Sequence, residues 1–242
     1  MRILVTNDDG INSSLLKILV NSLKKYANEI LVVAPLVEMS ATSRKLTLRE
    51  GLDVVKCSDI VEGILSYSVK GTPADCVKIG LFLLNFNPDV IISGINNGYN
   101  VGNDILYSGT VSASMEAALC GYKGIAISFE KDDIKAQIHL ENVLDYLFES
   151  DIYKEAEVLN INIPNNSKGI KITHQGTFPF ETKYEKIKDD NLYYAIARCI
   201  GLEVENTLDS DVYNVYHGYT SISPLTTNRS SSFKINSISA LS

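Results

Sequence analysis

The sequence predicts an α/β fold in which a Rossmann-like parallel sheet is sandwiched by helices. Short aliphatic runs, typical of buried parallel strands, alternate along the chain with amphipathic helical patterns. A hydrophobic fraction of 45% with 21% charged residues is ordinary for a globular protein. The 242 residues are enough for one large domain with a substantial core.

The first aliphatic run, residues 2–6, ends at Asn7, Asp8, Asp9 and a glycine. Ligands of open α/β sheets bind at the carboxyl ends of the strands, so the two carboxylates are expected in the substrate crevice. Adjacent carboxylates repel each other unless a cation lies between them, and a hard divalent metal is the commonest one. The alternative is a solvated turn in which one of these residues caps the next helix.

The next segments predict a helix over residues 12–26 and a second strand over 29–35, joined by a right-handed parallel crossover. Residues 35–45 then form a polar loop, again at the carboxyl end of a strand. Its hydroxyls, including Ser40, can reach a metal or phosphate, and Arg44 can pair with an anion. An ordinary Ser/Thr-rich loop is the alternative.

Residues 47–55 and 64–69 are expected to form a β hairpin or flap inserted into the core. Thr72 and Pro73 then predict a helix start, with the threonine as its N-cap. A third core strand is expected over residues 89–94.

The richest polar stretch follows that strand. Residues 94–103 hold three glycines and four asparagines, which allow the backbone to approach a ligand closely. Ser108, Gly109 and Thr110 then open an alanine-rich helix, where free N–H groups and the helix dipole favour an anion. A surface loop alone does not explain polar clusters at both places.

The remaining pattern predicts a strand at 124–128, a helix at 134–148 and a strand at 158–164. Beyond it, short segments rich in Tyr, Thr and Asn predict an irregular β structure. We therefore expect an α/β catalytic core over residues 1–165 and a β-rich C-terminal extension over 166–242. The extension has little core of its own, so it is expected to fold against a second subunit.

Several functions are disfavoured. Neither a Walker sequence nor a G-x-G-x-x-G fingerprint is present, and the carboxylate pair is not the D-x-D of aspartyl-phosphate phosphatases, so ATP and NAD are poor candidates. The net charge of −7 disfavours nucleic acid polymers. No apolar stretch reaches ~18 residues and no leader is visible, so we expect no membrane contact and a cytoplasmic protein.

His174 and His217 are candidate general acids, or simply satisfied polar residues.

In combination and in this order, the motifs resemble those of the SurE family, the stationary-phase survival proteins. The resemblance covers nearly the whole chain. It is carried by Asn7-Asp8-Asp9-Gly10, the Ser40 loop, Gly71-Thr72-Pro73-Ala74-Asp75-Cys76, Ser93-Gly94-Ile95-Asn96-Asn97-Gly98-Tyr99-Asn100-Val101-Gly102, Tyr107-Ser108-Gly109-Thr110-Val111 and Gly218-Tyr219-Thr220-Ser221-Ile222-Ser223-Pro224-Leu225.

The resemblance implies a metal-dependent 5'-nucleotidase that releases phosphate from nucleoside monophosphates. It implies one divalent ion per subunit, Mg²⁺ or Mn²⁺, and a homodimer or homotetramer with exchanged C-terminal extensions. The implied metal ligands are Asp8, Asp9, Ser40 and Asn96. The implied phosphate-binding residues are Ser108, Gly109 and Thr110, with Asn100 nearby.

The sequence departs from the family pattern at Ala41, where many members have glycine, and at Thr220, where valine is usual. Asp211 matches an acidic family position whose role is open. Our hypothesis is metal-assisted hydrolysis with Asp8 and Asp9 fixing the ion and one of them, preferably Asp8, acting as base or nucleophile. The alternatives are a broader phosphatase acting on 3'-nucleotides or short polyphosphate, and a non-catalytic nucleotide-binding protein.

Overall fold

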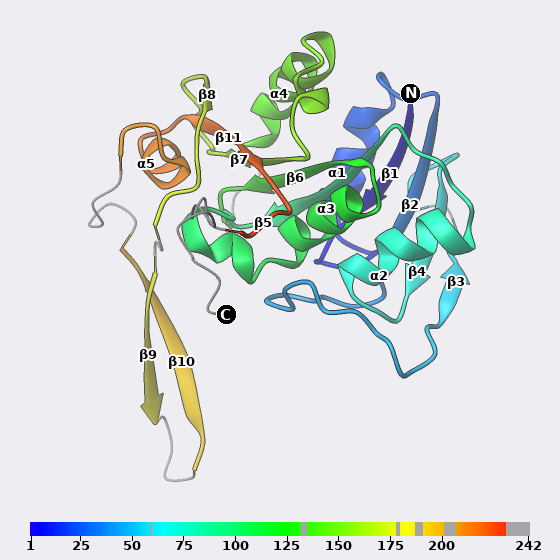
Figure 1. Cartoon of the computed structure of the whole chain (residues 1–242), viewed down its shortest axis with the longest axis horizontal. Helices are drawn as coiled ribbons and strands as arrows, with labels where there is room; N and C mark the ends of the chain where they lie inside the picture. The colour runs from blue at the N-terminus through cyan, green and yellow to red at the C-terminus, as the bar shows by residue number, and fades with distance from the viewer. Residues whose placement is uncertain (59, 132–134, 178–179, 187–190, 201–206, 231–242) are drawn as a thin grey trace, which may run out of the picture.

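The computed structural model describes residues 1–58, 60–131, 135–177, 180–186, 191–200 and 207–230 (Figure 1). Most strands join one mixed sheet in the order β3-β4-β2-β1-β5-β6-β7-β11-β8, and the other two form a separate hairpin. The strands are β1 (Arg2–Thr6), β2 (Glu29–Pro35), β3 (Val54–Lys56), β4 (Leu65–Val69), β5 (Val90–Asn97), β6 (Lys123–Phe129), β7 (Val158–Ile163), β8 (Ile170–Ile172), β9 (Phe180–Lys186), β10 (Tyr193–Cys199) and β11 (Thr220–Leu225).

The helices lie between these strands in the alternating order that the sequence predicts. They are α1 (Ser14–Leu23), α2 (Pro73–Lys78), α3 (Gly109–Leu119), α4 (Gln137–Glu149) and α5 (Asp211–Tyr216), with short η segments at Ile79–Leu83, Gly102–Leu106 and Ile152–Lys154. The predicted first residue of α4, 134, lies outside the described residues. The predicted α/β class with a Rossmann-like parallel sheet is confirmed.

The centre of the sheet is β1, which pairs in parallel with β2 on one side and β5 on the other. Its residues Ile3, Leu4 and Val5 are fully buried because helices cover both faces of the sheet. The chain runs outward from β1 to β2 and β4 in one direction, and through β5, β6 and β7 in the other. This reversal is the topological switch point where such sheets bind ligands.

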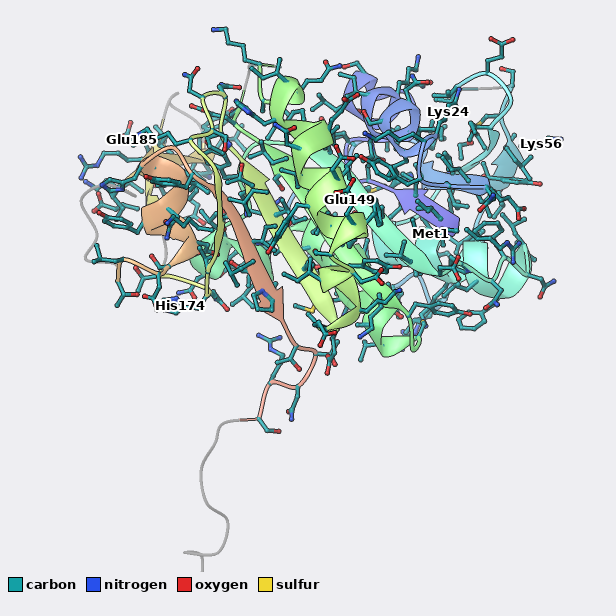
Figure 2. The ribbon with its side chains drawn as sticks, turned by 90° about the horizontal axis from the view of Figure 1, so that it is seen from above. Met1, Lys24, Lys56, Glu149, His174 and Glu185 are labelled. Carbon is teal, nitrogen blue, oxygen red and sulfur yellow. The ribbon has the colours of Figure 1, made fainter. Side chains whose placement is uncertain are left out.

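Helices α1 and α4 lie on one face of the sheet, and α2 and α3 lie on the other (Figure 1). On α1 the predicted apolar face is confirmed: Leu15, Leu16, Leu19, Val20 and Leu23 are buried. Seen from above, α1 and α4 lie beside each other across the sheet (Figure 2). Burying each such leucine or valine contributes ~1.5–3 kcal/mol, which holds each helix to the sheet.

The start of α2 confirms the prediction made for Thr72. The Thr72 side chain accepts a hydrogen bond from the Asp75 backbone N–H, and the Asp75 carboxylate accepts one from the Thr72 backbone N–H. Pro73 occupies the first helical position, where its missing N–H costs nothing.

The strand predicted over residues 47–55 is wrong over most of its length, because β3 spans only Val54–Lys56. The reason is that Asp75 accepts hydrogen bonds from both the backbone N–H and the hydroxyl of Thr47, which fixes this segment outside any strand ladder. The strands β3 and β4 do pair in antiparallel fashion, but β4 also pairs in parallel with β2. They are the edge of the main sheet rather than a separate flap.

The C-terminal part also contributes to the main sheet. β11 pairs in antiparallel fashion with β7, and β8 pairs in parallel with β11. Strands from both sides of residue 165, the predicted boundary between the core and the C-terminal extension, therefore belong to the same sheet. Thr220, the departure noted in the sequence, is fully buried, and its hydroxyl shares a 2.8 Å hydrogen bond with Ser167. The hairpin of β9 and β10 extends away from the rest of the chain (Figure 1). None of the described helices is long and apolar enough to cross a membrane.

Candidate functional site

A cleft of about 400 Å³ lies at the carboxyl ends of β1 and β5, where the strand order reverses. Side chains from four separate loops meet there because the parallel strands end at the same edge of the sheet. The lining residues are Asp8, Asp9, Glu38, Ser40, Ala41, Asn96, Asn97, Gly98, Tyr99, Asn100, Asp104, Tyr107, Ser108 and Lys131. All four residues expected to bind metal are among them.

Asp8 is the most constrained of these groups, with only 4% of its surface exposed. The Thr110 backbone N–H donates to Oδ2 at 3.1 Å, and the Thr110 hydroxyl donates to Oδ1. Gly109 lies against the same side chain, since a β-carbon there would come within 2.8 Å of Asp8 Cβ. Burial raises the pKa of Asp8, and the bonds from Thr110 oppose that shift.

Asp9 carries an unsatisfied acceptor. Its Oδ2 is buried and has no hydrogen-bond partner among the described residues. Burial, followed by the charges of Asp8 and Glu38, raises the pKa of Asp9 to about 6. Asn7 Oδ1 is similarly buried without a partner, while its Nδ2 donates to the Gly10 carbonyl. Buried oxygens that lack donors favour a bound cation at this position.

The Ser40 loop is held beside the carboxylates by the backbone. The Met39 N–H donates to the Asp8 carbonyl at 2.7 Å, and the Ser40 hydroxyl donates to Glu38 Oε1 at 2.7 Å. Ala41 adopts φ of 55°, a left-handed conformation that glycine occupies at lower cost. The departure from glycine noted in the sequence therefore falls at a position where a side chain adds backbone strain.

Asn96 belongs to β5, which continues to Asn97, beyond the end at 94 that the sequence predicts. The register between β5 and β6 shifts between Gly94 and Asn96, and such a bulge redirects the following side chains. The Asn96 Nδ2 donates to the Gly98 carbonyl at 2.7 Å. This bond fixes the amide group and leaves Oδ1 as the acceptor that can serve a cation.

The expected phosphate-binding residues fall into two pairs. Asn100 and Ser108 line the cleft, whereas Gly109 and Thr110 lie behind Asp8 and do not line it. The Ser108 hydroxyl caps α3 by accepting a bond from the Val111 N–H, which leaves its proton free to donate. Much of the positive end of α3 thus stabilises Asp8 and the cap, rather than an external anion.

Asn100 is positioned by residues that sequence reasoning missed. Its backbone N–H donates to Asn162 Oδ1 at 2.7 Å, and its carbonyl accepts from Nδ2 of both Asn160 and Asn162. Its own Nδ2 donates to Ser128 Oγ. The signal in the sequence was the alternation of asparagine with apolar residues in β7, which indicates polar side chains facing one side of a buried strand.

Asp211 has a structural role in the same loop system. Its side chain, in a residue that is 1% exposed, accepts hydrogen bonds from the backbone N–H groups of Gly102, Gly176 and Val212 at 2.7–3.0 Å. Burial raises the pKa of Asp211, and the three N–H donors oppose this shift. Gly102 requires its glycine, because φ is 56° and a β-carbon would lie 1.9 Å from the Thr177 carbonyl oxygen.

None of the three histidines lines the cleft. His139 Nε2 accepts a bond from the Ser167 N–H, His217 stacks on Tyr213, and His174 lies at the surface near α5 (Figure 2). The cleft instead contains Asp104, which the sequence analysis did not single out. Burial raises the pKa of this carboxyl group, which favours its protonated form.

The donor set of the cleft consists of oxygen atoms. Within the described part of the chain, no group of three His, Cys, Asp or Glu side chains could hold a metal ion. The candidate ligands are two carboxylates, a serine hydroxyl and an asparagine amide oxygen from three segments of the chain. Hard cations such as Mg²⁺ and Mn²⁺ favour oxygen ligands of this kind and retain several waters.

The chain is similar to known proteins over most of its length. A family model described as survival protein SurE matches residues 3–182. The chain is 40% identical over 233 residues to the 5'-nucleotidase SurE of Caldanaerobacter subterraneus subsp. tengcongensis, covering 92% of this chain and 90% of that protein. It is 38% identical over 241 residues to the 5'-nucleotidase SurE of Clostridium beijerinckii, and the match covers 93% of this chain and 92% of that protein. The crystal structure of the SurE protein from Aquifex aeolicus superposes with a TM-score of 0.78 at 32% identity over 95% of both chains.

Proposed function

The chain belongs to the SurE family and is a 5'-nucleotidase, and on that premise we propose how its cleft hydrolyses nucleoside 5'-monophosphates. The proposal is that Asp8, Asp9, Ser40 and Asn96 hold one divalent ion per subunit, Mg²⁺ or Mn²⁺. The observation that carries it is the buried Asp9 Oδ2, which lacks a donor in a cleft where the other three ligands also converge.

The residues fit such an ion in both charge and chemistry. Two adjacent carboxylates with raised pKa values repel each other, and a divalent charge between them would remove that repulsion. The Ser40 hydroxyl donates to Glu38, so its lone pairs are left to face the ion. A bound divalent ion would act as a Lewis acid. It would offset the negative charge of the phosphate and lower the pKa of the attacking water.

The phosphate group is proposed to lie between Ser108 and Asn100. The Ser108 hydroxyl keeps a free proton for a phosphate oxygen, because its oxygen already accepts from Val111. Asn100 Nδ2 donates to the Ser128 hydroxyl, which can itself donate as well as accept. The Asn100 amide can therefore turn over, so that its oxygen accepts from Ser128 and its NH₂ group faces the phosphate. Thr110 and Gly109 act indirectly by fixing Asp8.

The leaving nucleoside oxygen needs a proton, and Asp104 is our candidate donor. It lies in the cleft, and burial raises its pKa toward the range in which a carboxylic acid can act as general acid. Its replacement, Asp104→Asn, is expected to lower kcat more for natural nucleotides than for p-nitrophenyl phosphate, whose leaving group needs no proton. Equal losses for both substrates would exclude this role.

Association of subunits is proposed from the projecting hairpin. Tyr184 is 72% exposed and Tyr193 is 64% exposed, on a two-stranded unit that is only marginally stable when isolated. We expect this hairpin to pack on a second copy in a homodimer or homotetramer. Light scattering of the wild type and of a Tyr184→Glu, Tyr193→Glu double variant tests this, and a wild-type monomer would contradict it. The cytoplasmic location stays a prediction.

The decisive experiment is phosphate release from a panel of nucleoside monophosphates with Mg²⁺ or Mn²⁺ and a chelator control. We expect at least ~100-fold loss of kcat in Asp8→Asn, as for removal of an essential charged group. Asp53→Asn, the same change at an exposed carboxylate, should retain full activity. Calorimetric titration of Mn²⁺ gives a readout independent of turnover, and wild-type affinity in Asp9→Asn would exclude the proposed metal site. Inclusion of 3'-nucleotides and short polyphosphate defines the substrate range.

A further inference from the structure

A second cavity, larger than the catalytic cleft, has no role in the proposed function. It has a volume of about 870 Å³, within the range of pockets that hold whole small-molecule ligands. We call it the basic cavity, because Arg44, Lys45 and Arg229 line it and no carboxylate among the residues that the structure describes does so. The chain carries a net charge of −7, so a pocket whose described charged lining residues are all cations is a local reversal of sign.

The rest of the lining determines what kind of anion fits. Apolar side chains, including Leu106, Met115 and Leu225, form part of the wall, and hydroxyl and amide groups complete it. A simple inorganic anion would gain little from the apolar wall. A ligand with an apolar ring at one end and several negative charges at the other matches both parts.

The basic cavity is separate from the catalytic cleft. The two share no lining residue, although neighbouring positions of the same two segments line both. Between them, the Ser43 N–H donates to the Tyr107 carbonyl at 2.9 Å and the Ser43 hydroxyl donates to the Leu106 carbonyl at 2.8 Å. These bonds join the segments into a common wall, so a ligand in the basic cavity does not reach Asp8 or Asp9 directly.

From these observations we propose that the basic cavity is a second nucleotide site, which binds a nucleoside di- or triphosphate. Two or three phosphates match the three cations, and the base occupies the apolar side. The site is distinct from the one that holds the monophosphate substrate during hydrolysis.

Occupancy of this site is coupled to the catalytic cleft through the Ser40 loop. Arg44 and Lys45 follow within five residues of Ser40, and Ala41 and Ser43 between them adopt left-handed φ angles of 55° and 51°. Because two residues of this short segment have disfavoured φ angles, a ligand that binds at Arg44 and Lys45 can change the backbone conformation at Ser40. Ligand binding at the cations therefore alters Mn²⁺ affinity at Ser40, and by linkage Mn²⁺ alters ligand affinity by the same factor.

The test is calorimetric titration of ADP, GDP and inorganic phosphate into the full-length protein carrying Asp8→Asn, which prevents turnover. We expect saturable nucleoside diphosphate binding that falls at least ~10-fold when Arg44→Glu and Lys45→Glu are added, because charge-assisted bonds to phosphate are lost. Lys56→Glu makes one such charge reversal on β3 at the far edge of the sheet (Figure 2) and should leave binding unchanged. With Asp8 intact, Arg44→Glu with Lys45→Glu should remove the change in Mn²⁺ affinity that ADP causes in the wild-type protein.

Three results would overturn the proposal. The first is no saturable binding at millimolar nucleotide. The second is binding that survives charge reversal in the basic cavity but is lost in Asp9→Asn, which places the nucleotide in the cleft alone. The third is equal affinity for inorganic phosphate, which removes the need for the nucleoside. None of them bears on whether the catalytic cleft hydrolyses monophosphates, so failure here leaves the proposed function standing.

Discussion

The replacement Asp9→Asn is expected to stabilise the metal-free protein while removing metal binding. In the folded chain the pKa of Asp9 rises from the usual 3.8 to about 6, so the folded state holds the charged form poorly. This difference corresponds to about 3 kcal/mol as an upper bound, because Asp9 is not fully buried. An asparagine retains an oxygen for its neighbours and carries no charge to repel Asp8 or Glu38.

The sign of the pH dependence follows from the direction of the shift. Below the pKa of Asp9 in the unfolded chain, near 4, the carboxyl group is protonated in both states and does not destabilise the fold. Above its pKa in the folded chain, about 6, the group is ionised in both states and the destabilisation is complete. The stability gained by Asp9→Asn should therefore be near its maximum at pH 8, and about half of that at pH 5.

Urea unfolding at pH 5 and pH 8 in the presence of a chelator measures this effect, with Asp53→Asn as the matched control. Adding Mn²⁺ should stabilise the wild type at pH 8 and should leave Asp9→Asn unchanged. A variant that is less stable than the wild type at both pH values, or equally stabilised at both, would refute the reasoning from buried charge.

Three further predictions concern the groups that support the cleft. Thr110→Val should lower kcat ~10-fold or more, since the hydroxyl donor to Asp8 is lost, while Thr110→Ser should retain activity; steady-state kinetics checks both. Gly109→Ala should weaken Mn²⁺ binding in calorimetry and cost ~1–3 kcal/mol in urea unfolding, because its β-carbon meets Asp8. Asp211→Asn should cost ~2 kcal/mol and increase hydrogen exchange at the Gly102 amide, which loses a charged acceptor; unchanged exchange there would contradict the anchoring role.

The sequence predicted local features well. The helix cap at Thr72 and the helix start at Ser108 were identified correctly because the signal lies within four residues, and hydrophobic periodicity identified the buried face of α1. The strand predicted over 47–55 failed because Asp75, which lies 28 residues from Thr47, captured its polar groups. Local propensity contains no information about such a distant partner.

The same distinction explains the candidate site. The family resemblance implied Asp8, Asp9, Ser40 and Asn96 as ligands, and their common cleft agrees with the expectation that the segments after parallel strands share one edge of the sheet. The position of Thr110 relative to Asp8 could not be derived, because a helix start that receives a phosphate and one that receives a carboxylate have the same local sequence. The partners of Asn100 were likewise hidden, since they come from a strand 60 residues later.

The attachment of Asn100 to β7 has a consequence for how this protein becomes active during synthesis. The carboxylates belong to the first strand, yet Asn160 and Asn162 fasten the loop opposite them. A nascent chain that has emerged only as far as α4 contains every proposed metal ligand without the strand that sets the substrate side of the cleft. Contacts of such long sequence separation form late, because loop closure must precede them. We therefore expect catalytic competence to be acquired late in folding, after β7 has joined the sheet.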